Sequence, residues 1–387
     1  MPTIIYISAV ASIIGGPNVF AVADSSSPFD IKIYDQDGDS FSLRQTLTQD
    51  TSSENGLNIS FNKDGTYMIV SNDVRGSIYK FDGSNYNLLT SVLPNPSNGL
   101  TEVIFHPFTN HFITTHGSGD GYNFYKIEDD EVLHISSISV SPGVPSVSFA
   151  IGSRSMAFSK DGLQLAICGR LSPSNIVRVY DVDIGSDGIS FSYEISLPPS
   201  NYLTTTPTPT SVQFSPDGQY LFVSHTMSQN KVVISGPTTP SNMFYIYCRL
   251  YQKSGGVWVL VDDLRTSPPS NTDMFTPYGM AVSDDGQYLA LMGDAPLSTP
   301  TLRFFKKVGG SLTQLSVDTQ PIGEDGLFIR NACFDKDGIR LAVIFDKTMT
   351  LYKRTGDALN KMTVSSVDHI DTGPGIAFSP LAIPGSR

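Results

Sequence analysis

The sequence has little charge and few cysteines, and both scarcities limit what the protein can be. Only 16% of its 387 residues are charged, against about a quarter in typical globular chains. Lysine and arginine never cluster, and the formal net charge is −12, which argues against nucleic acid as a partner. The cysteines Cys168, Cys248 and Cys333 lack metal-type spacing and lie in apolar runs, so we expect small buried side chains rather than disulfides.

The sequence also lacks an apolar run long enough to span a bilayer. The apolar stretch IIYISAVASIIGG at 4–16 precedes the first basic residue, Lys32, so the positively charged start of a signal peptide is missing. We therefore expect this stretch to be a strand, with no signal peptide and no membrane insertion.

One short phrase is repeated along the chain. FSPDGQYLFVSH at 214–225 recurs as FNKDGTYMIVSN at 61–72, FSKDGLQLAICG at 158–169, VSDDGQYLALMG at 282–293 and FDKDGIRLAVIF at 334–345. FHPFTNHFITTH at 105–116 has lost the Asp-Gly pair, and IAFSP at 376–380 begins a copy that stops short. Successive copies start 44 to 68 residues apart, a period typical of propellers and other repeat arrays.

Each copy predicts part of a four-stranded antiparallel sheet. The phenylalanine ends a first strand, Asp-Gly makes a tight turn, and an apolar second strand follows that suits burial on both faces. A third strand ends in an aromatic residue before another glycine turn, as in SIYKFDGS at 77–84, and an alternating fourth strand closes the unit.

Such units predict an all-β fold, a seven-bladed β-propeller of four-stranded antiparallel blades in a single domain over 1–387. One blade is split between 1–50 and 371–387, so that pairing of the N- and C-terminal segments closes the ring. Which of TIIYISAV and GIAFSP lies innermost in that blade stays open. The other blades begin near residues 58, 102, 155, 211, 279 and 331.

Turn chemistry accounts for the repeated aspartates, because glycine supplies the positive φ and aspartate bonds its own backbone. We therefore expect neither catalysis nor a metal at these positions, and no cofactor. The aspartates are Asp64, Asp161, Asp217, Asp285 and Asp337.

The ends of the second strands are expected around one mouth of the central channel. These residues could form a catalytic or metal-binding pocket, or they could be polar simply because the channel mouth is in contact with water. We favour the contact with water, because no nucleophile signature or metal-ligand pattern accompanies these residues. They are Asp24, Asn72, Asp73, His116, Arg170, His225, Asp294 and Asp346.

Long loops leave the same face, at 198–210, 226–242 and 265–276. Long loops within compact domains are either functional or tolerated insertions. We expect any partner to bind there, through the candidate residues Tyr202, Leu203, Met227, Lys231, Met274 and Phe275.

The repeated FSPDGQYLFVSH, with the later YKRTGD at 352–357, resembles the WD40-like propeller repeats of tailed-bacteriophage virion proteins over nearly the whole chain. FSPDG-x-x-L also occurs in lactonase-like seven-bladed propellers and in periplasmic β-propeller proteins. The Trp-Asp and Gly-His signatures of true WD40 repeats are absent.

The resemblance implies a non-catalytic structural or interaction component of a virion, such as a head decoration, tail or host-contact protein, made in the host cytoplasm. Its partners would be other virion proteins, a host surface or a glycan, reached by oligomeric or symmetric docking. We accordingly expect no enzymatic activity.

An alternative is a lactonase-like hydrolase acting on a sugar lactone, with its pocket near His116, Arg170 and His225. FHPFTNHFIT at 105–114 keeps the Phe-His-Pro opening of that family but loses the following turn glycine. A cellular scaffold propeller that binds a peptide is a third option, because propellers host many functions.

Overall fold

The computed structural model of the protein describes residues 6–7, 19–23, 29–37, 40–49, 58–71, 76–92, 100–116, 122–138, 155–170, 175–196, 208–226, 232–233, 243–266, 276–295, 299–315, 329–335, 337–345, 349–362 and 375–378. These residues form strands and turns, with the 3-10 helix η1 (Ile184–Ser186) between two strands. The chain divides into two compact units. Unit 1 comprises Met1–Gly152, Arg330–Arg354 and Asn360–Arg387, and unit 2 comprises Ser153–Ile329 and Thr355–Leu359.

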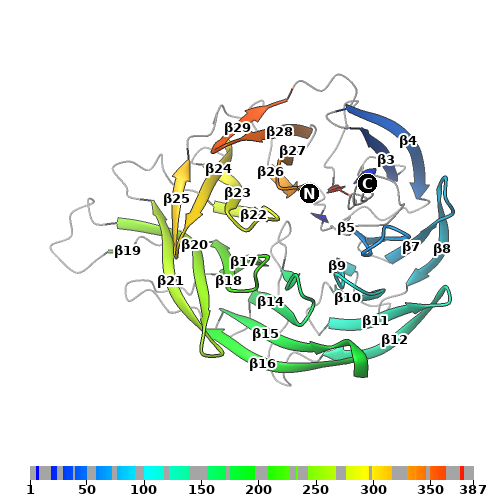
Figure 1. Ribbon diagram of the computed structural model, residues 1–387, viewed down its shortest axis with the longest axis horizontal. Helices are drawn as coiled ribbons and strands as arrows, with labels where there is room; N and C mark the ends of the chain where they lie inside the picture. The colour runs from blue at the N-terminus through cyan, green and yellow to red at the C-terminus, as the bar shows by residue number, and fades with distance from the viewer. Residues whose placement is uncertain are drawn as a thin grey trace, which may run out of the picture. The chain divides into compact units, whose positions relative to one another are not determined.

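Two blades of unit 1 are built from strands that follow one another in the sequence (Figure 1). The first contains β5 (Asn58–Phe61), β6 (Tyr67–Ser71), β7 (Gly76–Phe81) and β8 (Tyr86–Val92), and the short strand β1 (Tyr6–Ile7) pairs in parallel with β5. The second contains β9 (Leu100–Phe105), β10 (His111–His116), β11 (Tyr122–Glu128) and β12 (Glu131–Ile138).

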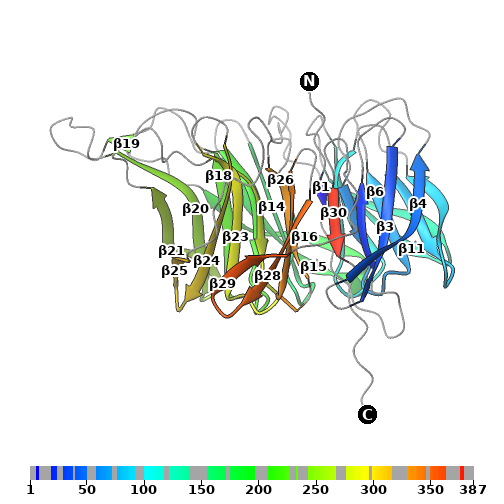
Figure 2. The same ribbon diagram turned by 90° about the horizontal axis from the view of Figure 1, so that it is seen from above.

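Strands from the first and the last part of the sequence pair in one sheet of unit 1. Its strands, in spatial order, are β30 (Gly375–Phe378), β2 (Val19–Ala23), β3 (Phe29–Asp37) and β4 (Ser40–Gln49). β2 and β30 are antiparallel, with Phe20 opposite Phe378 and Ala23 opposite Gly375. β30 is thus the edge strand beside β2, whereas β1 joins β5, and Figure 2 shows β1 and β30 side by side.

A further blade consists of β26 (Ile329–Phe334), β27 (Arg340–Phe345), β28 (Met349–Thr355) and β29 (Ala358–Lys361). Most of it belongs to unit 1, while the tip of the β28–β29 hairpin, Thr355–Leu359, groups with unit 2.

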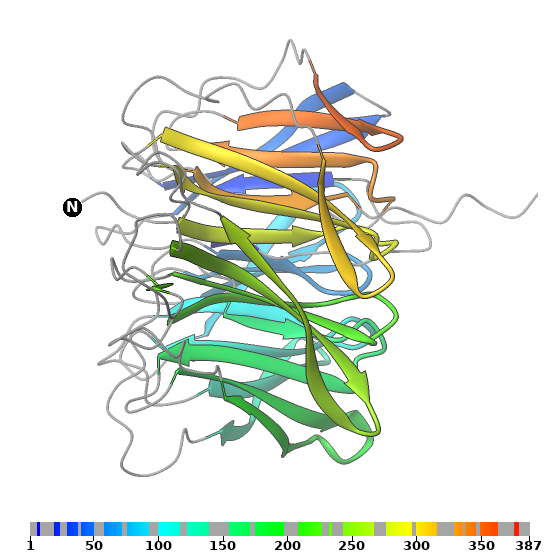
Figure 3. The same ribbon diagram turned by 90° about the vertical axis from the view of Figure 1, so that its left-hand side faces the viewer.

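Unit 2 contains three blades of consecutive strands. One has β13 (Met156–Phe158), β14 (Gln164–Arg170), β15 (Asn175–Asp183) and β16 (Gly188–Ser196). The next has β17 (Thr208–Phe214), β18 (Tyr220–Thr226), β20 (Met243–Ser254) and β21 (Val257–Thr266), and the short β19 (Val232–Val233) pairs with the start of β20. The last has β22 (Thr276–Val282), β23 (Tyr288–Ala295), β24 (Thr299–Val308) and β25 (Ser311–Leu315). Figure 3 shows the long β20–β21 hairpin in yellow-green.

The fold is therefore an all-β propeller with four-stranded antiparallel blades. Among the described residues, six blades consist of consecutive strands, so the expected count of seven is corrected. The split unit does form a sheet, but its β2–β30 pairing joins strands that both belong to unit 1. This pairing joins residues 19–23 to residues 375–378 and does not show the closure of a ring. The assignment of 1–387 to a single domain stays a prediction.

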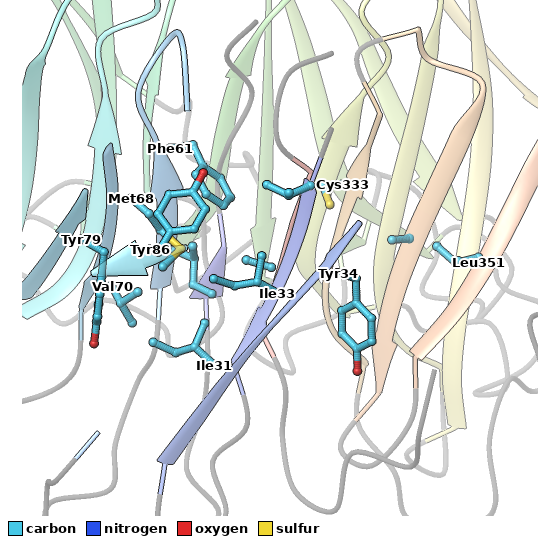
Figure 4. Packing of buried hydrophobic residues seen from close by; sticks show 14 residues of the cluster. Ile31, Ile33, Tyr34, Phe61, Met68, Val70, Tyr79, Tyr86, Cys333 and Leu351 are labelled. Atoms are coloured by element: carbon cyan, nitrogen blue, oxygen red, sulfur yellow. The ribbon is translucent and has the colours of Figure 1, made fainter. Parts of the chain in front are cut away.

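Apolar side chains of several sheets share the core of unit 1 (Figure 4). Ile31 and Ile33 of β3 are fully buried there, as are Met68 and Val70 of β6. Cores of this kind explain the near-continuous hydrophobicity of the second strands, which are covered on both faces. The cluster also includes Tyr34, Phe61, Tyr79, Tyr86, Cys333 and Leu351.

The repeated phrase forms a turn in which side chains complete the hydrogen bonding. Between β17 and β18, the Ser215 hydroxyl donates to the Asp217 carboxylate and accepts from the Tyr220 amide at 2.9 Å. Asp217 Oδ1 accepts from the Gln219 amide at 3.0 Å, and Gly218 has a φ of +65°. The prediction that Asp-Gly here is turn chemistry is confirmed.

A tyrosine and a lysine of one blade clamp an aspartate of another in both units. In unit 1, the Tyr67 hydroxyl donates to Asp130 Oδ1 at 2.7 Å, and Lys80 Nζ lies 2.6 Å from Asp130 Oδ2. In unit 2, the Tyr288 hydroxyl donates to Asp357 Oδ1 at 2.6 Å, and Lys306 Nζ lies 2.8 Å away from that oxygen.

Candidate active site

The predicted channel-mouth residues fall into three groups. Asp24, Asn72, Asp73 and Asp346 lie outside the described residues. His116, Arg170 and Asp294 are placed as backbone in β10, β14 and β23, while their side chains are outside the description. His225 alone of the eight has a described side chain, so it is the starting point for the site.

All six predicted partner-loop residues lie outside the described part of the chain. They are Tyr202, Leu203, Met227, Lys231, Met274 and Phe275. Partner binding through these loops stays a prediction, as do the expected oligomeric docking and virion location.

His225 lies near the end of β18 and is fully buried. It is opposite Pro209 in the β17–β18 pair, and neither ring nitrogen has a hydrogen-bond partner within the described protein. Burial, with a smaller contribution from the nearby positive charge of Arg249, lowers the pKa of His225 to about 3. The ring is therefore neutral at physiological pH. This dry environment differs from the wet channel mouth expected for the residue.

Arg249 of β20 lies on the same face of the sheet as His225. Arg249 is opposite Val223, and His225 follows Val223 by two positions, which returns the side chain to the same face of a strand. This face packs against the blade of β13–β16, where Val223 meets Ala166 and Cys168.

A buried ion pair holds Arg249. Its side chain is 4% exposed, and its Nε donates to Asp263 Oδ1 of β21 at 3.2 Å. The two residues are directly opposite each other in the β20–β21 pair. Nη1 of Arg249 has no hydrogen-bond partner within the described protein. The guanidinium thus has a fixed position and a remaining donor.

Two neighbours of Arg249 stay uncharged. Burial raises the pKa of Tyr251 to about 12, although the positive charge of Arg249 opposes this shift. Burial also raises the pKa of Cys248 far above its usual value, so its thiol is not an activated nucleophile.

The opposite face of the same blade carries hydroxyl groups. Thr210 Oγ1 and Ser224 Oγ lie 2.9 Å apart, and Thr210 Oγ1 also donates to the Pro277 carbonyl of β22 at 3.4 Å. Ser224 and Thr210 are fully buried. These bonds fix the end of β18 against the neighbouring blade and so position the adjacent His225.

The prediction from sequence missed Arg249 and Asp263. The available signal was Arg249 as the only charge in the apolar run YIYCRLY at 245–251. A charged residue in a buried strand requires a partner, and the sequence pattern did not show that Asp263 is opposite to it.

A second missed group lies three residues before the repeat phenylalanine. Asn58, Glu102 and Ser211 occupy this position in β5, β9 and β17, and all three are buried. In unit 1, Asn58 Oδ1 accepts from the Val103 amide at 3.3 Å. The Asn58 side chain thus links β5 to β9, and the alignment of the repeat copies shows a polar residue at this position in all three strands.

Within the described residues, no group of three or more histidine, cysteine, aspartate or glutamate side chains could hold a metal ion. The same part of the chain has no helix with the length and apolarity to cross a membrane. The arrangement at His225 offers instead a neutral imidazole and a fixed guanidinium, groups suited to proton transfer and to binding a polarised oxygen.

No protein-family model matches the sequence, and no curated protein matches it either. Solved structures do resemble the fold. A putative 6-phosphogluconolactonase from Bacteroides fragilis is 14% identical with a TM-score of 0.62, over 95% of this chain and 99% of that chain. The periplasmic gluconolactonase PpgL from Pseudomonas aeruginosa is 16% identical with a TM-score of 0.63, over 93% and 99%.

A third similar structure is the β-propeller domain of Cps50 (Swd1) from Myceliophteria thermophila. It is 10% identical with a TM-score of 0.58, and the match covers 90% of this chain and 98% of that chain. The WD40-like β-propeller fold predicted from the repeats is thereby confirmed. At these identities, the similarity establishes the fold and leaves the activity to be argued from the site.

Two predictions about function change with these comparisons. The expectation of a protein without enzymatic activity is contradicted, because neighbours over nearly the full length are named as lactonases. The virion role has no support, since no relationship to phage proteins is found. The similar structures include propellers named as lactonases, which agrees better with the alternative prediction than with the virion role.

Proposed function

We propose that the protein is a hydrolase of the lactonase type that opens a sugar lactone, with His225 as general base and Arg249 as the group that binds the carbonyl oxygen. The observation that carries this proposal is the neutral, buried imidazole on the same face as a buried guanidinium with a remaining donor. The similarity to propellers named as lactonases supports it.

His225 would take a proton from water as the water oxygen attacks the lactone carbonyl carbon. The ring C–O bond then breaks, and the imidazolium returns the proton to the leaving alkoxide, so that one water is consumed and one hydroxy acid is formed. The enclosed ring, with a pKa of about 3, is unprotonated at neutral pH but only a weak base. Its basicity must therefore rise when the site opens and admits water, because a general base is most effective with a pKa near the working pH.

Arg249 would stabilise the negative charge that develops on the carbonyl oxygen. Its Nε is engaged by Asp263, so Nη1 is left to donate to the substrate. A fixed donor in a water-excluded site stabilises such an oxyanion more strongly than a mobile one, because no reorganisation is needed during the reaction. Since His225 is enclosed, the reaction requires this end of β18 to open and admit the lactone with one water.

The test is lactone hydrolysis by the purified full chain, followed as acid release in a pH-stat with glucono-1,5-lactone and with simpler γ- and δ-lactones. The spontaneous rate is subtracted. We expect turnover, and a loss of kcat of about 10²-fold or more in His225→Gln, because a positioned general base contributes about 10² to 10⁴.

His134 supplies the matched control, because it lies in the outer strand β12 with an exposed bond to Ser137. His134→Gln should keep full activity. Arg249→Lys tests the binding of the carbonyl oxygen by Arg249. This variant keeps the positive charge, and we expect its kcat to fall. Absence of turnover on all these lactones, or full activity in His225→Gln, would contradict the proposal.

A further inference from the structure

The turn between β9 and β10 in unit 1 differs in its side chains from the turn of the 214–225 copy. His106 stands at the place of Ser215, Phe108 at the place of Asp217 and His111 at the place of Tyr220. The Phe108 amide donates to His106 Nδ1 at 3.2 Å. Thr109 Oγ1 lies 3.0 Å from His106 Nδ1 and 2.8 Å from His111 Nδ1. Both histidines are buried, with exposed fractions of 4% and 3%. We call the chain of His106, Thr109 and His111 the histidine relay.

These contacts fix where the protons are. Because His106 Nδ1 accepts from the Phe108 amide, it carries no proton, and a neutral His106 is protonated at Nε2. The Thr109 hydroxyl can then donate only to His106 Nδ1, since two bare acceptors at 3.0 Å would repel. Thr109 Oγ1 consequently accepts from His111, so His111 carries its proton at Nδ1.

His106 is the member of the relay whose Nδ1 is held as an acceptor by two donors, the Phe108 amide and the Thr109 hydroxyl. A second proton on His106 must go to Nδ1, which turns the acceptor into a donor facing the Phe108 amide and the Thr109 hydroxyl. Protonation of His106 therefore removes the two bonds at its Nδ1, while the backbone bond from the His106 amide to the His111 carbonyl at 2.8 Å remains.

The turn also connects two blades of unit 1. Asn110, next to Thr109, accepts through Oδ1 from Asn62 Nδ2 at 2.8 Å, and Asn62 Nδ2 also donates to Asp64 Oδ1 at 2.6 Å. The Ile127 amide of β11 donates to the Asn110 carbonyl at 3.0 Å. A change at Thr109 thus acts directly on the contact between the β5–β6 and β9–β10 turns.

The surroundings of the relay contain few charges. On the β11 side, Lys126 is opposite His111 and pairs with Glu128 at 3.2 Å. The β5–β6 turn contributes Asp64, which is linked to the relay through Asn62 and Asn110. The face of His111 stacks on Phe124 at 5.2 Å between ring centroids. Among the described residues, the other charged groups on these elements are Lys63 in the β5–β6 turn and Glu102 in β9.

We propose that the histidine relay makes the β9–β10 turn an acid-operated switch, in which protonation of His106 releases Thr109 and Phe108 and loosens the Asn62–Asn110 contact between two blades. Phe108 is 52% exposed at the tip of this turn, so its ring is free to reorient when the turn opens. The inference concerns unit 1 and does not depend on the proposed hydrolase activity.

The test is nuclear magnetic resonance of the full chain with 15N-labelled histidine. Near neutral pH, long-range proton–nitrogen spectra should show His106 protonated at Nε2 and His111 protonated at Nδ1. On acidification, the Phe108 backbone amide and the Asn62 side-chain amide should shift along the titration curve of His106.

The variant Thr109→Val removes the hydroxyl at nearly constant volume. We expect His111 to lose its preference for the Nδ1–H form, and the Asn62 amide to stop following His106. Thr109→Ser should restore both signals. The proposal is overturned if His106 is protonated at Nδ1 near neutral pH, or if both amides follow His111. Should Thr109→Val fail to fold, the tautomers and titration of the wild type and of Thr109→Ser still decide.

Discussion

The copies of the repeat at 214–225 in unit 2 and 105–116 in unit 1 form the same hairpin with different chemistry. In the first, Ser215 and Asp217 complete the turn around Gly218, whose φ is +65°. In the second, His106 and Thr109 bond the turn without a glycine in that place. Both hairpins lead into a buried second strand of equivalent register, Phe214 opposite Leu221 and Phe105 opposite Phe112.

The difference teaches that the turn tolerates replacement as long as its backbone groups keep partners. What sets the two copies apart is the surroundings of the second strand. Behind 214–225, β20 brings Arg249 into the blade, and this charge lies on the face that also carries His225.

The largest effect is expected at the ion pair behind the 214–225 copy. Asp263→Ala leaves Arg249 buried and charged without its partner, and breaking such a pair costs about 3 to 5 kcal/mol of unfolding free energy. Urea unfolding at pH 7 measures it. The control is Asp284→Ala, which removes the exposed Lys160–Asp284 pair of the same unit and should cost less than about 1 kcal/mol. Equal losses would show that Arg249 is solvated.

Two turn glycines with the same backbone conformation are expected to differ in how much stability is lost when each is replaced by alanine. Gly218 and Gly286 have φ values of +65° and +66°, but a Cβ at Gly218 meets nothing within 4 Å, whereas one at Gly286 would lie 2.7 Å from Pro216 Cδ. Gly218→Ala should cost about 1 to 2 kcal/mol for the positive φ, and Gly286→Ala about 1 to 3 kcal/mol more for the overlap. Thermal unfolding of both variants provides the comparison, which fails if the two lose equal stability.

His225 predicts a dependence of stability on pH. Its pKa is lowered from 6.5 to about 3 in the folded protein, so between these values the unfolded chain binds a proton that the folded chain excludes. The contribution of His225 to the free energy of unfolding is complete above pH 6.5. Below that pH it falls by at most about 1.4 kcal/mol for each pH unit of acidification. Urea unfolding at pH 7, 6 and 5 should show a shallower slope in His225→Asn than in the wild type. Parallel slopes would mean that the ring titrates normally.

The smallest effect is expected where the two units are built alike. Tyr67→Phe and Tyr288→Phe each remove one hydrogen bond to an aspartate, Asp130 or Asp357, at the outer part of a clamp. Each should cost about 1 kcal/mol, and the two losses should agree. A difference well above that figure, measured by urea unfolding, would show that one clamp contributes more than its hydrogen bond.

Much of the fold was predictable because the repeat combines three local signals. Asp217-Gly218 predicts a tight turn, the apolar residues Leu221 to Val223 predict a buried strand, and the spacing of the copies predicts a repeated sheet. The number of blades was not predictable. The split unit was counted as a seventh blade because its C-terminal segment begins a copy of the repeat that the N-terminal segment would complete. Which strand β1 pairs with also depended on a contact between distant segments, and it joins β5 rather than the sheet of β30 and β2.

The candidate site was predictable only in part, and the reason is again distance along the chain. His225 was identified from its place at the end of a second strand, but its neutral state results from enclosure by other strands. Arg249 and Asp263 are 24 and 38 positions away and become neighbours only through the register of β18, β20 and β21.

By itself, the sequence determined the strands, their turns and their grouping into four-stranded blades, because these follow from interactions within a few residues. Only the tertiary structure decided which polar side chains are enclosed together, and thereby which are charged. Burial changes the energy of an ionised group by an amount set by every atom around it, and in this chain those atoms come from strands that the repeat pattern alone does not align.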